Sequence, residues 1–254
     1  MLLVLDIGNT NTVVGLFEAG SLKGHWRLSS IERTSDETGI MIRGLIRLAG
    51  MDASRIEGAI LSSVVPRLEE VWRDAARSYL DVDPIVVSRG IDLGLEVRTD
   101  NPDEVGADRL VNSVAAMTKY GKPVISVDLG TAITFDVVSA DGAYIGGAIA
   151  PGLSVSMETL FRRTAKMPQI ALAAPERFIG SNTMTATQSG IVNGYTGLVD
   201  FINEGIFSEL GARTPVVATG GHAEILASRS STITHIEPWL TLDGLLILYG
   251  RCVK

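Results

Sequence analysis

The sequence predicts an α/β protein made of two similar halves. Residues 2–5 are apolar, residues 6–12 form a polar Asp-Ile-Gly-Asn-Thr-Asn-Thr stretch, and residues 13–17 are apolar again. This pattern is typical of a strand, a tight turn and a second strand. The same plan recurs over residues 124–135, where Asp128, Gly130 and Thr134 match Asp6, Gly8 and Thr12 at an offset of 122 residues (128 − 6). At the same offset, Gly142 beyond this stretch matches Gly20. We therefore expect a duplicated α/β domain, mixed sheets flanked by helices, with two carboxylate-bearing loops that face a cleft between the halves.

The first half has the order of a ribonuclease-H-like domain. A third strand is expected over 21–28, and further strands over 59–65 and 84–87. Apolar residues recur about one turn apart over 35–50, which indicates an amphipathic helix, and Gly50 would end it. Pro66 is a plausible start for a second helix that reaches Leu80. Three strands followed by helix, strand, helix and strand complete this half.

The second half repeats the three strands and adds a long helix. Gly146 and Gly147 within its third strand suggest a bulge or a close backbone approach. Helices are expected over 154–163 and from about 185 to 210, a strand over 215–219, and a last helix over 240–249 that packs on the second sheet. The glycines at 190, 194 and 197 allow the long helix either to meet a partner helix in a dimer or to pack on its own sheet. We expect domains at 1–118 and 119–254.

Composition excludes several classes of protein. The 254 residues are 46% hydrophobic and 20% charged, which suits a chain with a substantial core. The net charge of −7 argues against general nucleic-acid binding, which needs a basic surface. A single cysteine fits a reducing cytoplasm, and no apolar stretch reaches membrane-spanning length. We therefore expect a cytoplasmic protein without a nucleic-acid or membrane partner.

The first polar turn has the composition of a phosphate-binding loop. Gly8 allows a sharp turn and a close approach to a ligand. The amides and hydroxyls of residues 9–12 can donate to phosphate oxygens, and Asp6 adds one carboxylate. That combination suits Mg²⁺, which usually takes one or two carboxylates together with phosphate oxygens. The alternative is a hairpin whose polar tip merely faces water, since turns favour glycine, asparagine and aspartate for local reasons.

A second candidate site lies between the two halves of the sequence. Pro102, followed by two acidic residues, resembles a helix N-terminus. Asp108 and Arg109 come just after the small residues Gly106 and Ala107, which leave room for a ligand. In the functional reading, Asp108 accepts a proton from a substrate hydroxyl and Arg109 stabilises negative charge nearby. The alternative is an exposed pair on a solvated helix, or an internal ion pair.

The motifs that are missing narrow the choice of nucleotide site. The sequence contains no P-loop, no Gly-x-Gly-x-x-Gly after a strand and no Gly-x-Ser-x-Gly elbow. A nucleotide site would therefore be of the Asp-x-Gly kind. Gly220 and Gly221, between a strand and a helix, suit a nucleotide as well, although two glycines alone are weak support.

Four stretches together resemble the type III pantothenate kinases of the acetate and sugar kinase, Hsp70 and actin superfamily. They are Asp6-Ile-Gly-Asn-Thr-Asn-Thr, Gly106-Ala-Asp-Arg, Asp128-Leu-Gly-Thr-Ala and Thr219-Gly-Gly, and they occur in that family's order and spacing over essentially the whole chain. The Gly-Ala-Asp-Arg element is the most specific of them. The resemblance implies an actin-like ATPase fold, a homodimer, and the phosphorylation of pantothenate by ATP with Mg²⁺ and a monovalent cation, potassium or ammonium.

The resemblance also implies a role for particular residues. ATP phosphates would be bound by Asp6, Ile7, Gly8, Asn9, Thr10, Asn11, Thr12, Val13 and Thr131. Pantothenate would be bound by Gly106, Ala107, Asp108, Arg109 and Thr183, with Asp108 as proton acceptor. Asp128 would hold the monovalent cation, Asp6 the Mg²⁺ directly or through water, and Gly220 and Gly221 would lie on the adenine side. Some members carry a tyrosine before the Asn-Pro pair, where this chain has Arg98-Thr99-Asp100, so no aromatic substrate contact is transferred.

Two other functions are compatible with the Asp-x-Gly turns. Another small-acid or sugar kinase of the superfamily would keep these turns but would not need residues 106–109. A nucleotide-dependent regulator would bind ATP without a small acceptor, and members of the family have been described as accessory regulators of transcription. The acidic charge of this chain counts against direct DNA contact.

Overall fold

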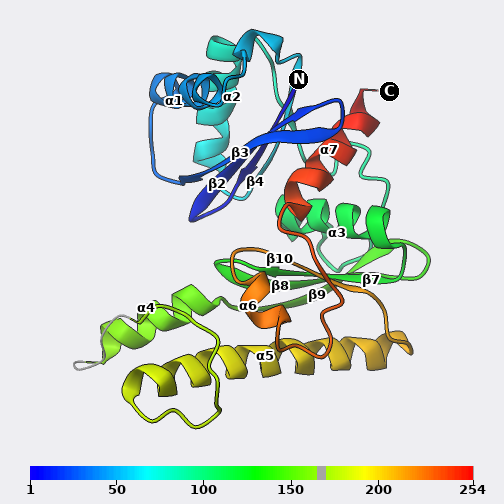
Figure 1. The fold of residues 1–254 in the computed structure, drawn as a ribbon. Helices are drawn as coiled ribbons and strands as arrows, with labels where there is room; N and C mark the ends of the chain where they lie inside the picture. The colour runs from blue at the N-terminus through cyan, green and yellow to red at the C-terminus, as the bar shows by residue number, and fades with distance from the viewer. Residues whose placement is uncertain (165–169, 254) are drawn as a thin grey trace. The chain divides into compact units, whose positions relative to one another are not determined.

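The structure is a computed structural model that describes residues 1–164 and 170–253. Contacts divide the chain into two compact units (Figure 1). The first contains Met1–Glu96, Asp100–Ala115 and the stretch from Leu240, and the second contains Val97–Thr99 and Ala116–Trp239. These units differ from the expected halves 1–118 and 119–254 chiefly because the last stretch of the chain returns to the first unit.

The first unit contains a mixed five-stranded sheet in the order β3-β2-β1-β4-β5. Its strands are β1 Leu2–Ile7, β2 Asn11–Glu18, β3 Ser21–Ser29, β4 Gly58–Ser63 and β5 Ile85–Val86. The first three strands pair antiparallel, while β4 lies parallel to β1 and β5 parallel to β4. This is the ribonuclease-H-like order that the sequence predicts.

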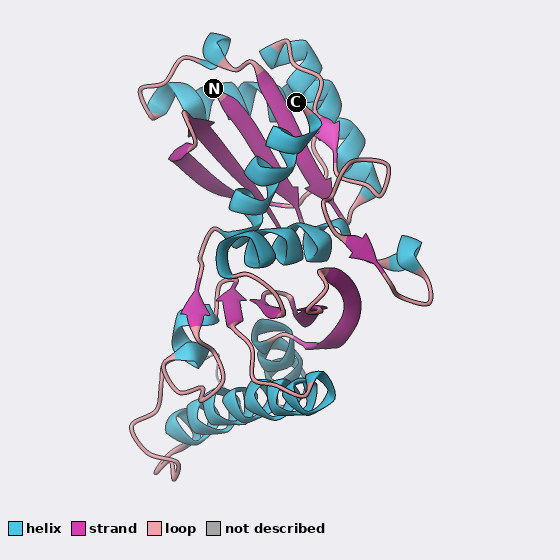
Figure 2. Ribbon diagram, turned by 90° about the vertical axis from the view of Figure 1, so that its right-hand side faces the viewer, coloured by secondary structure: helices cyan, strands magenta, loops and turns pink. Residues whose placement is uncertain are grey.

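Helices cover both faces of that sheet (Figure 2). Residues of α1 Ser35–Leu48 and α2 Pro66–Leu80 join the apolar core on one face, and α7 Leu240–Cys252 packs on β1, β4 and β2 on the other. The predicted packing of the last helix on the second sheet is therefore wrong. Small residues let α7 approach closely: a Cβ added at Gly58 would meet Tyr249, and one added at Gly244 would meet the backbone of Val111. A helix that is apolar all round gives no sign in the sequence of which sheet it covers.

The second unit repeats the strand order of the first. Its sheet runs β11-β10-β7-β8-β9-β6, with β7 Val124–Leu129, β8 Ala132–Val138 and β9 Ala143–Pro151 antiparallel in sequence. The strands β10 Val216–Thr219 and β11 His235–Ile236 add in parallel beyond β7, and β6 Glu96–Val97 lies at the other edge. The two sheets therefore share one topology, and the duplicated fold is confirmed.

Three helices belong to the second unit: α4 Leu153–Arg163, α5 Thr183–Leu210 and α6 Ala223–Ala227. Asn182 caps α5, since its side chain accepts from the backbone N–H of Thr185 and the Thr185 hydroxyl accepts in return from the backbone N–H of Asn182. Gly211, at φ 72°, ends the helix in the left-handed region. Helix α5 runs along the sheet that contains β7 and β8 (Figure 1). Its Val192, Val199 and Phe207 belong to one apolar core with the core-facing side chains of these strands.

The expected close approach at Gly147 is confirmed. A Cβ added there would lie 1.6 Å from the carbonyl oxygen of Phe135 on β8. The β8–β9 register also shifts between Val137 and Val138, as a β-bulge does. Only glycine leaves β9 this close to its neighbour.

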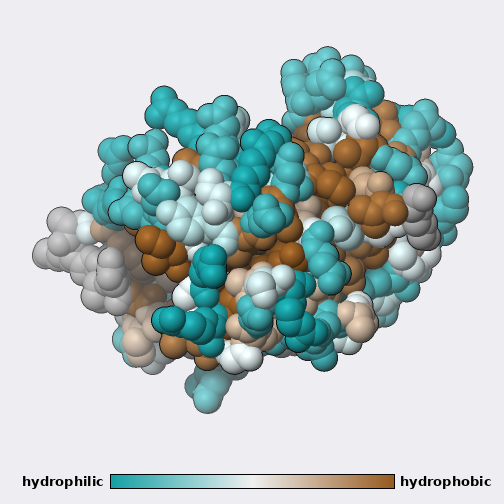
Figure 3. All heavy atoms as spheres, turned by 90° about the horizontal axis from the view of Figure 1, so that it is seen from above, coloured by the Kyte–Doolittle hydropathy of each residue, from teal (hydrophilic) through white to brown (hydrophobic). Residues whose placement is uncertain are grey.

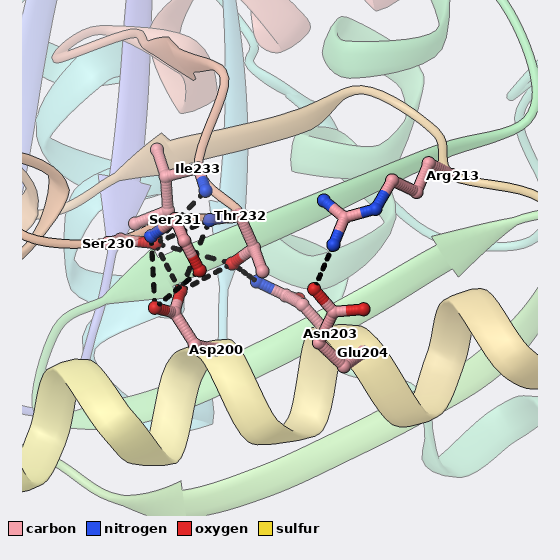
Figure 4. Close-up of polar contacts among 8 residues, drawn as sticks. All are labelled: Asp200, Asn203, Glu204, Arg213, Ser230, Ser231, Thr232 and Ile233. Atoms are coloured by element: carbon pink, nitrogen blue, oxygen red, sulfur yellow. Dashed lines mark hydrogen bonds and ion pairs between the residues drawn. The ribbon is translucent and has the colours of Figure 1, made fainter.

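Asp200 on α5 ties down the loop between α6 and β11 (Figure 4). Its carboxylate accepts from the Ser230 hydroxyl at 2.5 Å, the Ser231 N–H at 2.9 Å and the Thr232 hydroxyl at 2.7 Å. Partial burial alone would raise the pKa of Asp200, but these hydrogen bonds outweigh it and hold the pKa below its ordinary value. The loop that follows the Gly-Gly turn is thus fixed to the long helix.

Hydrophobic residues remain exposed between hydrophilic ones on the face drawn in Figure 3. In the first unit, Leu48 at the end of α1 is 84% exposed. Scattered apolar side chains of this kind are normal for a folded surface. Within residues 1–164 and 170–253, no helix combines the length and the apolar character needed to cross a membrane.

Candidate active site

The first polar turn closes on itself between β1 and β2. The Gly8 N–H donates to the Asn11 carbonyl at 3.0 Å, and Asn9 and Thr10 are exposed at the tip. Asp6 lies at the end of β1 opposite Ser62 on β4, whose hydroxyl donates to its carboxylate at 2.8 Å. The turn thus presents backbone and side-chain donors beside one oriented carboxylate. Sequence reasoning missed Ser62, because only the parallel pairing of β1 with β4 brings it to Asp6.

Thr12 is oriented away from that carboxylate. It pairs with Ile7, whose side chain belongs to the apolar core, so both lie on the core-facing side of the sheet. Its side chain is buried, and its hydroxyl forms a 3.0 Å hydrogen bond with Ser30. Of the predicted phosphate donors, Thr12 therefore keeps only its backbone for a ligand.

The segment 106–109 forms the start of helix α3, Ala107–Tyr120. The predicted helix start at Pro102 is wrong: Pro102–Glu104 is a separate 3₁₀ turn, so Glu104 and Asp108 do not share a helix face. The Asp108 carboxylate accepts from the backbone N–H of Arg109 at 2.8 Å. A Cβ at position 106 would lie 2.5 Å from the same Asp108 oxygen, so glycine leaves room for the carboxylate in this orientation.

The environment of Asp108 favours its protonated form. Burial raises the pKa of Asp108, and the N–H and the charge of Arg109 offset part of that rise without reversing it. A carboxylate with a raised pKa is a better proton acceptor than one in water, because general-base efficiency improves as the pKa approaches the working pH.

The second turn and the Gly-Gly turn converge on Asp128. The Gly130 N–H donates to the Ala132 carbonyl at 3.1 Å and closes the turn between β7 and β8. Cβ atoms added at Gly130 and Gly220 would lie 3.2 Å and 2.6 Å from the same oxygen of Asp128. Gly220 has φ 92°, a left-handed conformation that favours glycine. Both glycines therefore leave space around this carboxylate.

Two other predicted residues also lie in the second unit. Thr131 is exposed in the second turn, where its carbonyl accepts from the Gly152 N–H at 3.1 Å. Thr183 is the first residue of α5 and is likewise exposed. Gly221 follows Gly220 directly and precedes His222, the N-cap residue of the short helix α6.

A hollow of about 570 Å³ opens between α4 and His222. Its size is within the range of small-molecule sites. Its lining is half apolar and half polar, and consists of Ser154, Met157, Glu158, Phe161, Arg162, Ile170, Leu172 and His222. The Nδ1 atom of His222 is buried and has no hydrogen-bond partner among the described residues. Sequence reasoning missed this hollow, because no motif marks the α4 residues.

The carboxylates suit cations that take oxygen ligands. Among residues 1–164 and 170–253, no three His, Cys, Asp or Glu side chains are grouped so as to hold a metal ion. A divalent ion would therefore rely on one carboxylate together with phosphate oxygens and water, which is how Mg²⁺ usually binds. Asp6 fits this requirement, because Ser62 fixes its orientation.

The family model and the similar proteins that match this chain all carry the same family name. The family model of type III pantothenate kinases matches residues 2–204. A type III pantothenate kinase of Koribacter versatilis is 48% identical, covering 99% of this chain and 96% of that protein. One from Moorella thermoacetica is 45% identical, covering 99% of each.

Solved structures support the fold. A Baf family transcriptional activator from Campylobacter jejuni, described as putative, superposes with a TM-score of 0.62 at 19% identity, covering 98% of this chain and 97% of that one. The activator of 2-hydroxyisocaproyl-CoA dehydratase from Clostridium difficile, solved with bound ADPNP, gives a TM-score of 0.55 at 12% identity, covering 99% and 92%. At such low identities these likenesses concern the fold alone.

Proposed function

This chain belongs to the type III pantothenate kinase family, and we infer from its geometry how its residues carry out ATP-dependent phosphorylation of pantothenate, the first step of coenzyme A biosynthesis. The observation that carries the assignment is the Asp108 carboxylate. The Arg109 N–H orients it beside Gly106, which has no side chain, and burial raises its pKa. A hydroxyl acceptor in this place would find a proton acceptor that is already oriented.

Residues 106–109 and Thr183 would bind pantothenate. Asp108 would accept a hydrogen bond from the primary hydroxyl and orient its oxygen toward the γ-phosphorus of ATP. As the new P–O bond forms, the bond to ADP breaks and the hydroxyl proton passes to Asp108. Phosphoryl transfer proceeds through a loose transition state, so this proton moves late and positioning does most of the work. Arg109 would offset negative charge on the substrate or on the phosphoryl group.

ATP would be bound by both polar turns. The first turn, Asp6 to Val13, would donate to phosphate oxygens mainly through backbone N–H groups and the exposed side chains at its tip. Mg²⁺, held by Asp6 directly or through water, would neutralise charge on the phosphates. In the second unit, Thr131 would contact the nucleotide and Asp128 would hold a monovalent cation, potassium or ammonium.

The adenine side would lie at Gly220 and Gly221, next to the hollow described above. Phe161 and Met157 supply apolar surface there, and Ser154 and His222 add polar groups to the same lining. An aromatic base matches both features, because its ring can stack on apolar groups and its edge can hydrogen-bond.

We also propose that the enzyme is a homodimer formed through α5. One face of this helix has no cover within its own unit: Cβ atoms added at Gly190, Gly194 or Gly197 would meet nothing within 4 Å, and Phe201 is 82% exposed. Phe201→Glu would place a charge in that contact and should yield a monomer by light scattering. Leu48→Glu, which changes an equally exposed residue of α1, should stay dimeric. A wild-type monomer, or an unchanged mass for Phe201→Glu, would contradict this interface.

The activity itself is tested by ADP release from the purified protein with ATP and Mg²⁺. We expect release only when pantothenate is added, and faster release in potassium than in sodium buffer. Release that ignores pantothenate would refute the acceptor. Bound ATP without any release would favour a regulatory role.

A further inference from the structure

Several polar residues share one face of the second sheet, among them Thr219 on β10, which is paired with Asp128. Side chains alternate along a strand, and Val127 and Leu129 face the apolar core, so Asp128 points to the opposite face. Thr134 on β8 is paired with Asp128, and Asp136 follows two residues later, so both share that face. Asp136 is 1% exposed, which makes it the most deeply buried carboxylate of this group.

Asp136 determines which way the Thr134 hydroxyl points. Its carboxylate accepts from the Tyr144 hydroxyl at 2.9 Å and from the Thr134 hydroxyl at 3.0 Å. The Thr134 hydroxyl is the donor in this bond and has a single proton, so that proton is used here. The Thr134 oxygen is then left as an acceptor.

The residue opposite that acceptor is Asp128. Directly paired residues of an antiparallel ladder have Cβ atoms about 5 Å apart, so a hydroxyl oxygen without a free proton lies beside a carboxylate. A cation between two such oxygens removes their repulsion. Potassium-sized ions are commonly held by uncharged oxygens, which is what Thr134 offers.

The first sheet lacks this arrangement, although its sequence is similar. Thr12 corresponds to Thr134 by sequence offset, but it pairs with Ile7, faces the core and bonds to Ser30. The residue paired with Asp6 is Val13, which has no oxygen in its side chain. The acceptor beside the carboxylate therefore belongs to the second copy alone.

We propose that Thr134 is an oxygen ligand of the monovalent cation held by Asp128, and that Asp136 is the positioning residue that keeps the Thr134 hydroxyl turned as an acceptor. This inference rests on the proposed cation site and adds its second side chain. Asp136 touches neither substrate nor cation and acts only through Thr134.

Two measurements on the full chain test the proposal. In crystals soaked with Tl⁺, a potassium substitute with strong anomalous scattering, the anomalous peak should lie beside Asp128 with Thr134 Oγ1 among its ligands. In solution, the melting temperature should rise with KCl at constant ionic strength, as binding to the folded state requires. Thr134→Val should weaken the apparent K⁺ affinity about tenfold, the usual size of one lost ligand hydrogen bond or contact, while Thr134→Ser should keep it.

The controls separate cation binding from folding. Thr196→Val removes another buried hydroxyl, one that bonds to the Val192 carbonyl within α5, and should leave the K⁺ response intact. In Asp136→Asn the side-chain amide can donate to Thr134, so the Thr134 hydroxyl is no longer kept as an acceptor. This variant should therefore bind K⁺ more weakly, and its activity should recover at saturating KCl. An unchanged K⁺ response in Thr134→Val, with the response lost in Asp128→Asn, would overturn this inference and leave the cation site standing. A Tl⁺ peak away from Asp128 would overturn both, and the Tl⁺ experiment decides even if Thr134→Val does not fold.

Discussion

The Asp108→Asn variant is expected to turn over pantothenate about a hundredfold or more slowly than the wild type, while it binds ATP almost as well. Asparagine keeps the shape of the side chain and can still accept from the Arg109 N–H, the bond seen at 2.8 Å. It cannot take the hydroxyl proton. Steady-state kcat for ADP release and nucleotide affinity by calorimetry check the two halves of this expectation.

The thermal stability of Asp108→Asn provides the control, and the direction of its change in melting temperature follows from the pKa of Asp108. Burial raises the pKa of Asp108 in the folded state, so folding favours the neutral carboxyl. Its contribution to stability is present below the unfolded pKa of about 3.9 and is lost as pH rises through the folded pKa. Asparagine is neutral at every pH, so the variant should melt at the same or a higher temperature at pH 7. Near-normal turnover would refute the role of Asp108, and a lower melting temperature would contradict the burial argument.

The pH dependence of the wild type follows from the same shift. Turnover should rise with pH as Asp108 ionises, and the midpoint of that rise should lie above the ordinary range of an aspartate because burial raises this pKa. The asparagine variant should lack this limb in its residual activity. A wild-type profile that stays flat down to the ordinary aspartate pKa would show that Asp108 does not control the rate.

The sequence was sufficient for the parts of the fold that depend on local patterns. The strand and turn around Asp6 recur around Asp128, and both sheets adopt the same strand order. Gly146 and Gly147 were expected to mark a bulge or a close backbone approach, and the close approach is found at Gly147. The long helix expected from about 185 to 210 is also observed, as α5 Thr183–Leu210.

Features that depend on register or on distant packing were not predictable. Thr12 and Thr134 match in sequence, yet one faces the core and the other faces away, because the first turn contains one residue more before the strands pair. The partner Ser62 comes from the neighbouring strand β4, which no motif marks. The last helix covers the first sheet. This packing needs glycine at position 58, where Tyr249 lies close, and at position 244, where the backbone of Val111 lies close, and both contacts exist only in the folded chain.

Gly220→Ala is expected to impair folding stability and the cation response together. An alanine at φ 92° would carry a Cβ 2.6 Å from an oxygen of Asp128 and 2.7 Å from the carbonyl carbon of Leu129. The Leu129 backbone cannot move without disturbing β7, so the Asp128 carboxylate should be displaced. We expect a lower melting temperature, loss of the KCl-dependent rise in that temperature, and a kcat/KM reduced about a hundredfold, as for other misplaced active-site groups.

Gly211→Ala is the matched control for this variant. Gly211 also has a left-handed backbone, at φ 72°, but a Cβ there would meet nothing within 4 Å. Its replacement should therefore cost only the conformational strain, about 1–2 kcal/mol, and leave the K⁺ response unchanged. Gly220→Ala should lose more stability than this control, because the collision adds to the strain. Equal losses in the two variants, with the K⁺ response kept in both, would show that the space beside Asp128 is not needed for the site.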